Sequence, residues 1–141
     1  MSYLLDTCAI SEFARPAPAR RLVDWIEAQR EEELFASAIV LGELARGLAL
    51  LEDGSQKRRL GAWLHSDLRA RLRGRVLEVS AQVALKWGEL SGEAARRGVT
   101  VSMADGLIGA TAIVHSMTVV TRNVDDLAAT GALVFSPWED A

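Results

Sequence analysis

Four acidic residues, far apart in the chain, each stand beside an apolar segment at the point where it meets a turn or a helix. They are Asp6, which follows Tyr3–Leu5, Glu43 within residues 39–44, Asp105 within residues 102–106, and Asp126 within residues 121–127. A carboxylate in apolar surroundings is costly unless a cation pairs with it. Neighbouring Lys and Arg residues do not supply a partner for all four acids, whereas a shared divalent cation would.

The chemistry of such a site follows from its oxygen ligands. Carboxylates select hard cations, so Mg²⁺ or Mn²⁺ is expected instead of zinc. Without the cation, clustered carboxylates repel one another and their pKa values rise. With the cation bound, a metal-held water is a better nucleophile, and charge on a transferring phosphoryl group is stabilised. The four acids therefore indicate phosphodiester hydrolysis without a covalent enzyme intermediate.

Each acid also has a purely structural interpretation. Asp6 is a favoured residue type for the N-cap of a following helix. Ser102 and Asp105 have the spacing of a capping box, which explains Asp105 at least as well when it is taken alone. The acidic pair at residues 125–126 could be a solvated turn. Glu43 is the hardest to explain in this way, because no cap is needed in the middle of a helix.

Length and composition bound the possible functions. The 141 residues predict one domain over residues 1–141, and 50% hydrophobic with 25% charged residues exclude a disordered chain. A net charge of -3 excludes binding to nucleic acid by bulk charge. Cys8 is the only cysteine, which excludes an intramolecular disulfide and a Cys-based metal cluster. We expect Cys8 to be a small buried side chain and not a nucleophile.

One stretch of the chain is rich in arginine. Its members are Arg58, Arg59, Arg69, Arg71, Arg73 and Arg75. Two interpretations stay open: a solvated helix face, or a single basic region that contacts RNA phosphates or an acidic segment of a protein partner.

The expected location follows from two absences. The N-terminal residues 1–6 lack the basic segment and apolar core of a signal peptide. No apolar run reaches the roughly 20 residues that a membrane span requires. We therefore expect a cytoplasmic protein with no membrane association.

Short apolar segments alternate with helical patterns along the chain. Strands are expected at residues 3–5, 34–36, 75–79, 118–121 and 133–135. Helices are expected around residues 22–26 and over residues 38–51, 57–72, 81–97 and 103–116, with Ser37 and Ser80 as N-caps and Gly98 after one helix. This order predicts an α/β fold with a central parallel β-sheet flanked by α-helices. Sites in such folds form at the carboxyl ends of the strands.

Five segments together resemble the PIN-domain nucleases, and specifically the VapC toxins of bacterial toxin–antitoxin pairs. The segments are residues 4–8, 37–47, 104–112, 120–127 and 130–138, so the similarity spans nearly the whole chain. The resemblance implies a single PIN domain and Mg²⁺-dependent endoribonuclease activity on RNA. It also implies a homodimer that is neutralised by a VapB-type antitoxin.

The same resemblance assigns the acidic residues. Asp6, Glu43 and Asp105 match the three core acids of the family. Many relatives have Asp where this chain has Asn123, and an acid before an aromatic where this chain has Asp126 before Leu127. We assign Asp126 as the fourth catalytic and metal-binding acid, with Asn123 and Asp125 as the alternatives. Thr7 and Thr121 are expected to orient a carboxylate or a water at the site.

Other function classes fit less well. An aspartate-dependent phosphatase of the haloacid dehalogenase type needs a second Asp where Cys8 stands. A receiver-like phospho-acceptor module needs an acidic pair after the first strand, and Asp6 with Thr7 does not supply one. A non-catalytic PIN-like binding module is disfavoured because all three core acids are kept. For a partner, the apolar helices expected over residues 38–51 and 57–72 suit a groove that holds a helix.

Overall fold

The computed structural model describes residues 1–138 and shows a sheet of five parallel strands. The strands are β1 Tyr3–Leu5, β2 Leu34–Ser37, β3 Val76–Leu77, β4 Thr118–Val120 and β5 Val134–Phe135. Their order in the sheet is β3-β2-β1-β4-β5, and every neighbouring pair is parallel. The predicted α/β class and central parallel sheet are therefore confirmed. The strand expected at residues 75–79 is shorter, because only Val76 and Leu77 pair with β2.

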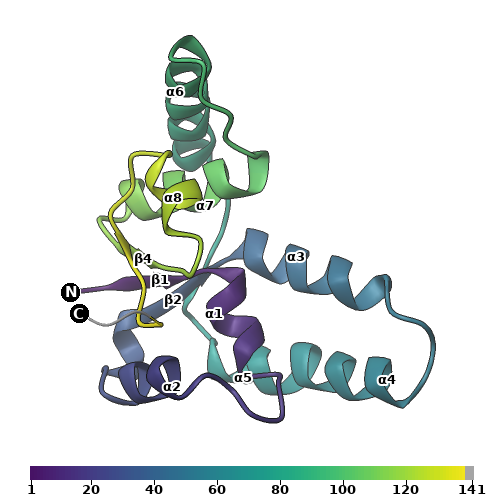
Figure 1. Ribbon diagram of the computed structural model, residues 1–141. Coiled ribbons are helices and arrows are strands. Elements are labelled where there is room, and N and C mark those ends of the chain that lie inside the picture. Colours follow the sequence, from purple (N-terminus) through teal and green to yellow (C-terminus); the bar gives the residue numbers. More distant parts are fainter. Residues whose placement is uncertain (139–141) are drawn as a thin grey trace.

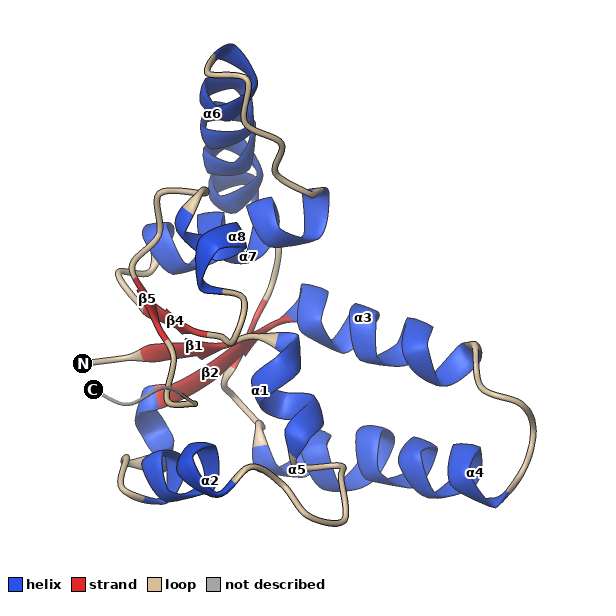
Figure 2. Ribbon diagram, viewed as in Figure 1, coloured by secondary structure: helices blue, strands red, loops and turns tan. Residues whose placement is uncertain are grey.

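Helices cover both faces of the sheet (Figure 1). They are α1 Thr7–Glu12, α2 Arg20–Glu27, α3 Ala38–Ala49, α4 Ser55–Ala62, α5 Arg69–Arg71, α6 Ala81–Arg96, α7 Met103–Val114 and α8 Val124–Ala128, with a 3-10 turn at Glu31–Glu33 and a π-helical turn at Trp63–Leu68. In Figure 2, α6, α7 and α8 lie on one side of the strands, and α1 and α2 lie on the other. Helices α3 and α4 project from the sheet as an arm.

Local sequence signals set where these helices begin and end. Three predicted serine caps each accept a backbone N–H of the first turn: Ser37 from Ile39, Ser80 from Val83, and Ser102 from Asp105. Gly98, with φ of +72°, follows α6 in the left-handed conformation that ends helices. These predictions are confirmed.

The helix predicted over residues 57–72 is interrupted. Between α4 and α5 the backbone forms a π-helical turn, Trp63–Leu68, which adds a residue to one helical turn. Leu64 and Leu68 both remain buried, so the apolar spacing that predicted the helix is kept. The π-helical turn leaves no trace in that spacing, because i to i+4 pairs suit either form.

The core is formed by the strands and the helices on either side of them. Leu4 of β1 and Val119 of β4 are fully buried and pair directly in the sheet. Leu22 of α2 belongs to the same cluster as Ile108 of α7. Burial of each large apolar side chain contributes about 1.5–3 kcal/mol. The two strands that carry the candidate site thus lie in the buried part of the sheet.

One close contact fixes α7 against the segment after α8. A Cβ at Gly109 would lie 2.2 Å from Thr130 Oγ1, so only glycine allows this approach. Thr130 is itself held, since its hydroxyl donates to the Leu127 carbonyl at 2.5 Å. The contact sets the position of α8 relative to α7, and each of these helices carries one acid of the predicted site.

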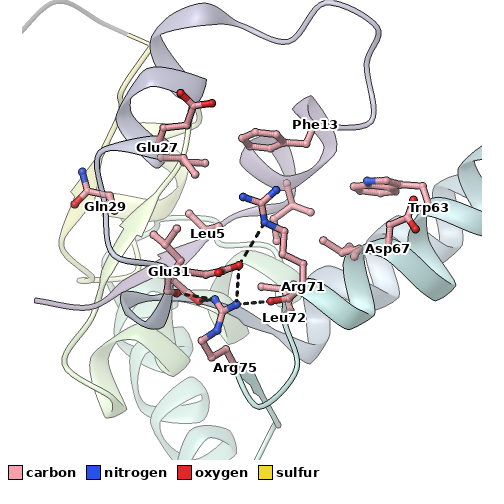
Figure 3. Close-up of a pocket in the computed structure, with 14 residues that line it drawn as sticks. Leu5, Phe13, Glu27, Gln29, Glu31, Trp63, Asp67, Arg71, Leu72 and Arg75 are labelled. Atoms are coloured by element: carbon pink, nitrogen blue, oxygen red, sulfur yellow. Dashed lines mark hydrogen bonds and ion pairs between the residues drawn. The ribbon is translucent and has the colours of Figure 1, made fainter.

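One member of the arginine-rich stretch, Arg75, is not part of an exposed basic surface. The Arg75 side chain is only 14% exposed and forms an ion pair with Glu31 at 3.5 Å. Its guanidinium also donates to the backbone carbonyls of Glu31, Leu34 and Arg71. Figure 3 shows this network on one wall of a hollow of about 270 Å³, with Phe13 and Trp63 across from it. Arg75 is therefore a structural residue that joins α5 to the start of β2.

The length of the helices and the number of domains also bear on the predictions made from the sequence. None of the helices in residues 1–138 combines the length and apolar character needed to cross a membrane. The single domain over residues 1–141 stays a prediction, and its residues 139–141 lie outside the described part of the chain.

Candidate active site

The carboxyl ends of β1 and β4 are neighbours in the sheet, and Asp6 lies between them. Asp6 is 4% exposed. Its Oδ1 accepts the Thr7 backbone N–H at 2.8 Å, which caps α1, and its Oδ2 accepts the Thr121 hydroxyl at 2.8 Å. Capping and a functional role coexist here, because each carboxylate oxygen keeps further acceptor capacity. The two bonds fix the orientation of the carboxylate.

Glu43 joins the same group through Thr7. The Thr7 hydroxyl donates to Glu43 Oε1 at 2.6 Å, while the backbone N–H of Thr7 binds Asp6. The predicted contacts of Thr7 and Thr121 with carboxylates are therefore confirmed. The expectation that Glu43 lies in apolar surroundings is wrong, because this residue sits on the exposed face of α3.

Asp105 lies in the first turn of α7, and its pKa is shifted by burial and by the charges of the other predicted acids. Burial raises the pKa of Asp105, hydrogen bonding to Ser102 opposes this, and the charges of Asp6, Asp126 and Glu43 raise the pKa further. The other three predicted acids thus all act on the carboxyl group of Asp105. Because the folded-state pKa lies above the ordinary value, ionised Asp105 lowers the stability of the fold at neutral pH, and stability returns as pH falls through that pKa.

The segment after β4 supplies Asp126. The Thr121 hydroxyl oxygen accepts the Asn123 backbone N–H at 2.9 Å, so the residue that binds Asp6 also shapes the start of α8. Asp126 lies on the exposed side of this helix, and its charge acts on Asp105. Asp126 stays the predicted fourth acid, with Asn123 and Asp125 as the alternatives.

We use the name acidic site for Asp6, Glu43, Asp105 and Asp126. None of these four carboxylates forms an ion pair with a Lys or Arg of residues 1–138. The atoms that these residues offer to a metal ion are all carboxylate oxygens, which suit Mg²⁺ or Mn²⁺. As they are placed, however, no three Asp, Glu, His or Cys side chains in the described chain could together hold a metal ion. Shared coordination would therefore require their side chains to rotate toward the cation.

Cys8 lies beside the acidic site. Its Sγ accepts the Arg122 backbone N–H at 3.3 Å and lies 3.8 Å from Asp6 Oδ2. Burial raises the pKa of the Cys8 thiol, and the Arg122 N–H opposes this. A neutral thiol is a weak nucleophile. The geometry fits the predicted role of Cys8 as a packed side chain, although it is only partly buried.

Sequence reasoning missed a second polar group near the acidic site. Glu12, at the end of α1, is 5% exposed and lies within ion-pair distance of Arg15 and Arg122. The signal available was weak. Glu12 and Arg15 have the i,i+3 spacing of a helical ion pair, but α1 has only six residues, too few for a reliable helical pattern.

Comparison with protein families gives one match that covers most of the chain. The family described as PIN domain matches residues 3–133.

The similarity to known proteins covers nearly the whole length of this chain and of each relative. Toxin FitB of Neisseria gonorrhoeae is 39% identical over 137 residues, covering 97% of this chain and 99% of that protein. VapC ribonuclease Y4jK of Sinorhizobium fredii is 36% identical over 138 residues, covering 98% and 99%. Among solved structures, FitAB bound to an IR36 DNA fragment superposes with a TM-score of 0.91 at 37% identity, covering 99% of this chain and 97% of that one.

Proposed function

The chain belongs to the PIN-domain family, and from this premise we propose that it is a metal-dependent endoribonuclease, the toxin of a toxin–antitoxin pair. The reaction is hydrolysis of RNA phosphodiester bonds at the acidic site, with Mg²⁺ or Mn²⁺. One observation carries the proposal: Thr7 binds both Asp6 and Glu43 at the carboxyl end of β1, and the charges of these two acids act on Asp105 in α7. The names of two similar proteins, a toxin and a VapC ribonuclease, support the same activity.

The residues of the acidic site have distinct parts in this proposal. Bound Mg²⁺ or Mn²⁺ would supply an activated water and stabilise charge on the phosphoryl oxygens. Asp6 is buried and fixed by two hydrogen bonds, so it would be the most rigid ligand of the cation. Thr7 orients Glu43 toward Asp6, and Thr121 orients Asp6 itself. Ionised Asp105 is repelled by its neighbours, so a cation would stabilise it most.

The activity is tested with purified, metal-stripped protein and single-stranded RNA. We expect cleavage after addition of Mg²⁺ or Mn²⁺ and none after a chelator is added, because the carboxylates alone only repel the phosphates. Products are resolved on a denaturing gel. Cleavage that persists at full rate in chelator would reject the proposed mechanism. Release of phosphate from a small phosphate ester, without RNA cleavage, would favour the aspartate-dependent phosphatase.

The proposed antitoxin site is a groove between α1, α3 and α4. This groove is a hollow of about 440 Å³ whose apolar lining includes Leu44, Leu48, Leu60 and Trp63. Thr7 and Glu43 line it as well, so the groove continues into the acidic site. An amphipathic helix of a VapB-type antitoxin would bury its apolar face there, and an Arg or Lys beyond the helix would reach the carboxylates.

Two further parts of the proposal concern assembly and location. We propose a homodimer, because Leu85 and Met103 are 72% and 62% exposed although both are large and apolar. Action on cellular RNA would place the protein in the cytoplasm.

A further inference from the structure

We propose that Arg15 and Arg122, both held on the buried carboxylate of Glu12, form a phosphate-binding site for the RNA strand beside the acidic site. Arg15 Nη1 and Arg122 Nη2 each lie 3.8 Å from Glu12 Oε2. The inference rests on the proposed ribonuclease function and deepens it. It identifies residues that hold the substrate at a distance from the bond that is cut.

Glu12 holds both arginines but can neutralise only one. Its side chain is 6% exposed, and Oε1 accepts the Ala19 backbone N–H at 2.9 Å. One negative charge against two guanidinium groups leaves a net positive charge. Both arginine side chains are at least half exposed, at 64% for Arg15 and 50% for Arg122. A buried acid thus fixes two cations that keep donors for an anion from solvent.

Arg122 is constrained along its whole length. Its backbone N–H donates to Cys8 Sγ, and its guanidinium lies 4.9 Å from the ring centroid of Trp138. A stacked, ion-paired guanidinium loses less entropy when it binds an anion than a mobile one does. Such preorganisation is typical of arginines that recognise phosphate.

Each of the two arginines lines a hollow that also contains a residue of the acidic site. Arg15 lines the groove together with Thr7 and Glu43, and Arg122 lines a separate hollow of about 450 Å³ together with Asp126. Glu12 stands six positions after Asp6, at the end of α1, which corresponds to roughly 9 Å along the helix. The pair is therefore placed to bind a phosphate next to the reacting one, and not the reacting phosphate itself.

The charge of the surroundings favours RNA as the ligand. The whole chain carries a net charge of -3, and the four carboxylates of the acidic site add local repulsion toward any polyanion. A strand that reaches those carboxylates needs a fixed cation nearby to hold it. An acidic peptide has no such reason to approach the acidic site, so it is kept as an outcome of the test.

The test measures binding of a short fluorescent single-stranded RNA to the full chain in chelator, where no cleavage is expected, over a range of salt concentrations. Each lost phosphate contact lowers the slope of log affinity against log salt by about 0.7. The double variant Arg15→Ala/Arg122→Ala is expected to bind more weakly, with a slope smaller by about 0.7, because the pair binds one phosphate. The matched control, Arg20→Ala/Arg96→Ala, removes the same charge from two exposed positions and is expected to keep the parental slope.

Two more variants separate charge from packing. Arg122→Lys keeps the charge and is expected to keep most of the slope. If Arg15→Ala/Arg122→Ala folds poorly, each single variant is measured, since Glu12 keeps one arginine in either of them. Parental slopes in the double and single variants would overturn the proposal while leaving the ribonuclease intact. The same holds if RNA binding is unchanged and only binding of an acidic peptide is lost. A parent that neither binds nor cuts RNA would overturn both proposals.

Discussion

Asp6→Asn is expected to lower the rate of RNA cleavage by roughly 1000-fold or more, because it removes the charge of the most rigid member of the acidic site. The fold should survive. Asn is as good an N-cap as Asp, so α1 keeps its cap, and an amide can still hydrogen bond to the Thr121 hydroxyl. Initial rates at saturating Mg²⁺ measure the effect. Asp67→Asn, at an exposed position that lines a different hollow, is the matched control and should cleave as the parent does.

Further variants of the acidic site should lower the cleavage rate by different amounts. Thr121→Val removes the hydroxyl that orients Asp6 and should cost roughly 10–100-fold. Asp126→Asn should cost more than Asp125→Asn, because the charge of Asp126 acts on Asp105. Parental activity in a folded Asp6→Asn protein would show that the acidic site is not the catalytic centre.

Induced expression of the chain should arrest growth, and co-expression of its cognate antitoxin should restore it. The expected partner is encoded by a small neighbouring gene, and the two proteins should co-purify. The groove between α1, α3 and α4 gives the physical reason, since it is apolar and leads to Glu43. Asp6→Asn should be non-toxic but still co-purify with the partner, because it changes the chemistry and not the groove.

A pair of leucines tests where the partner binds. Leu48 lines the groove, whereas Leu50, two residues later, is 70% exposed and does not. Leu48→Glu should weaken co-purification, and Leu50→Glu should not. Cleavage activity in both variants serves as the check on folding. Absence of toxicity together with no partner in a pull-down would reject the toxin assignment, although the nuclease proposal would stand.

The sheet could be predicted from the sequence because it depends on local patterns, whereas the roles of Thr7 and Thr121 follow from the family resemblance. Short apolar runs such as Tyr3–Leu5 specify buried strands, and parallel order brings the ends of β1 and β4 together. This order agrees with the contact between Thr121 and Asp6, which the family resemblance led us to expect. Serine caps were equally predictable, because an N-cap bond needs only the residues of one helical turn.

Other features depend on contacts that no local pattern records. Glu12 and Arg122 meet across the fold, from the end of α1 and the end of β4. Arg75 looked like one more basic surface residue, but its guanidinium satisfies carbonyls of the 3-10 turn, β2 and α5. Helix α8 has five residues, which is too short to show a helical period. These are the places where tertiary contacts and not sequence period decide the structure.

The most direct test of the shared cation is a Mn²⁺ titration in which thermal stability and RNA cleavage are followed together. Binding to the native state alone raises the melting temperature, so both signals should rise with the same midpoint in the parent. Asp105→Asn should relieve repulsion in metal-free protein and lose the Mn²⁺-dependent rise in both signals. Ser102→Ala removes only the helix cap, worth about 1 kcal/mol, and should keep that rise. Equal stabilisation by Mn²⁺ in the parent and in Asp105→Asn would contradict a cation shared by the acidic site.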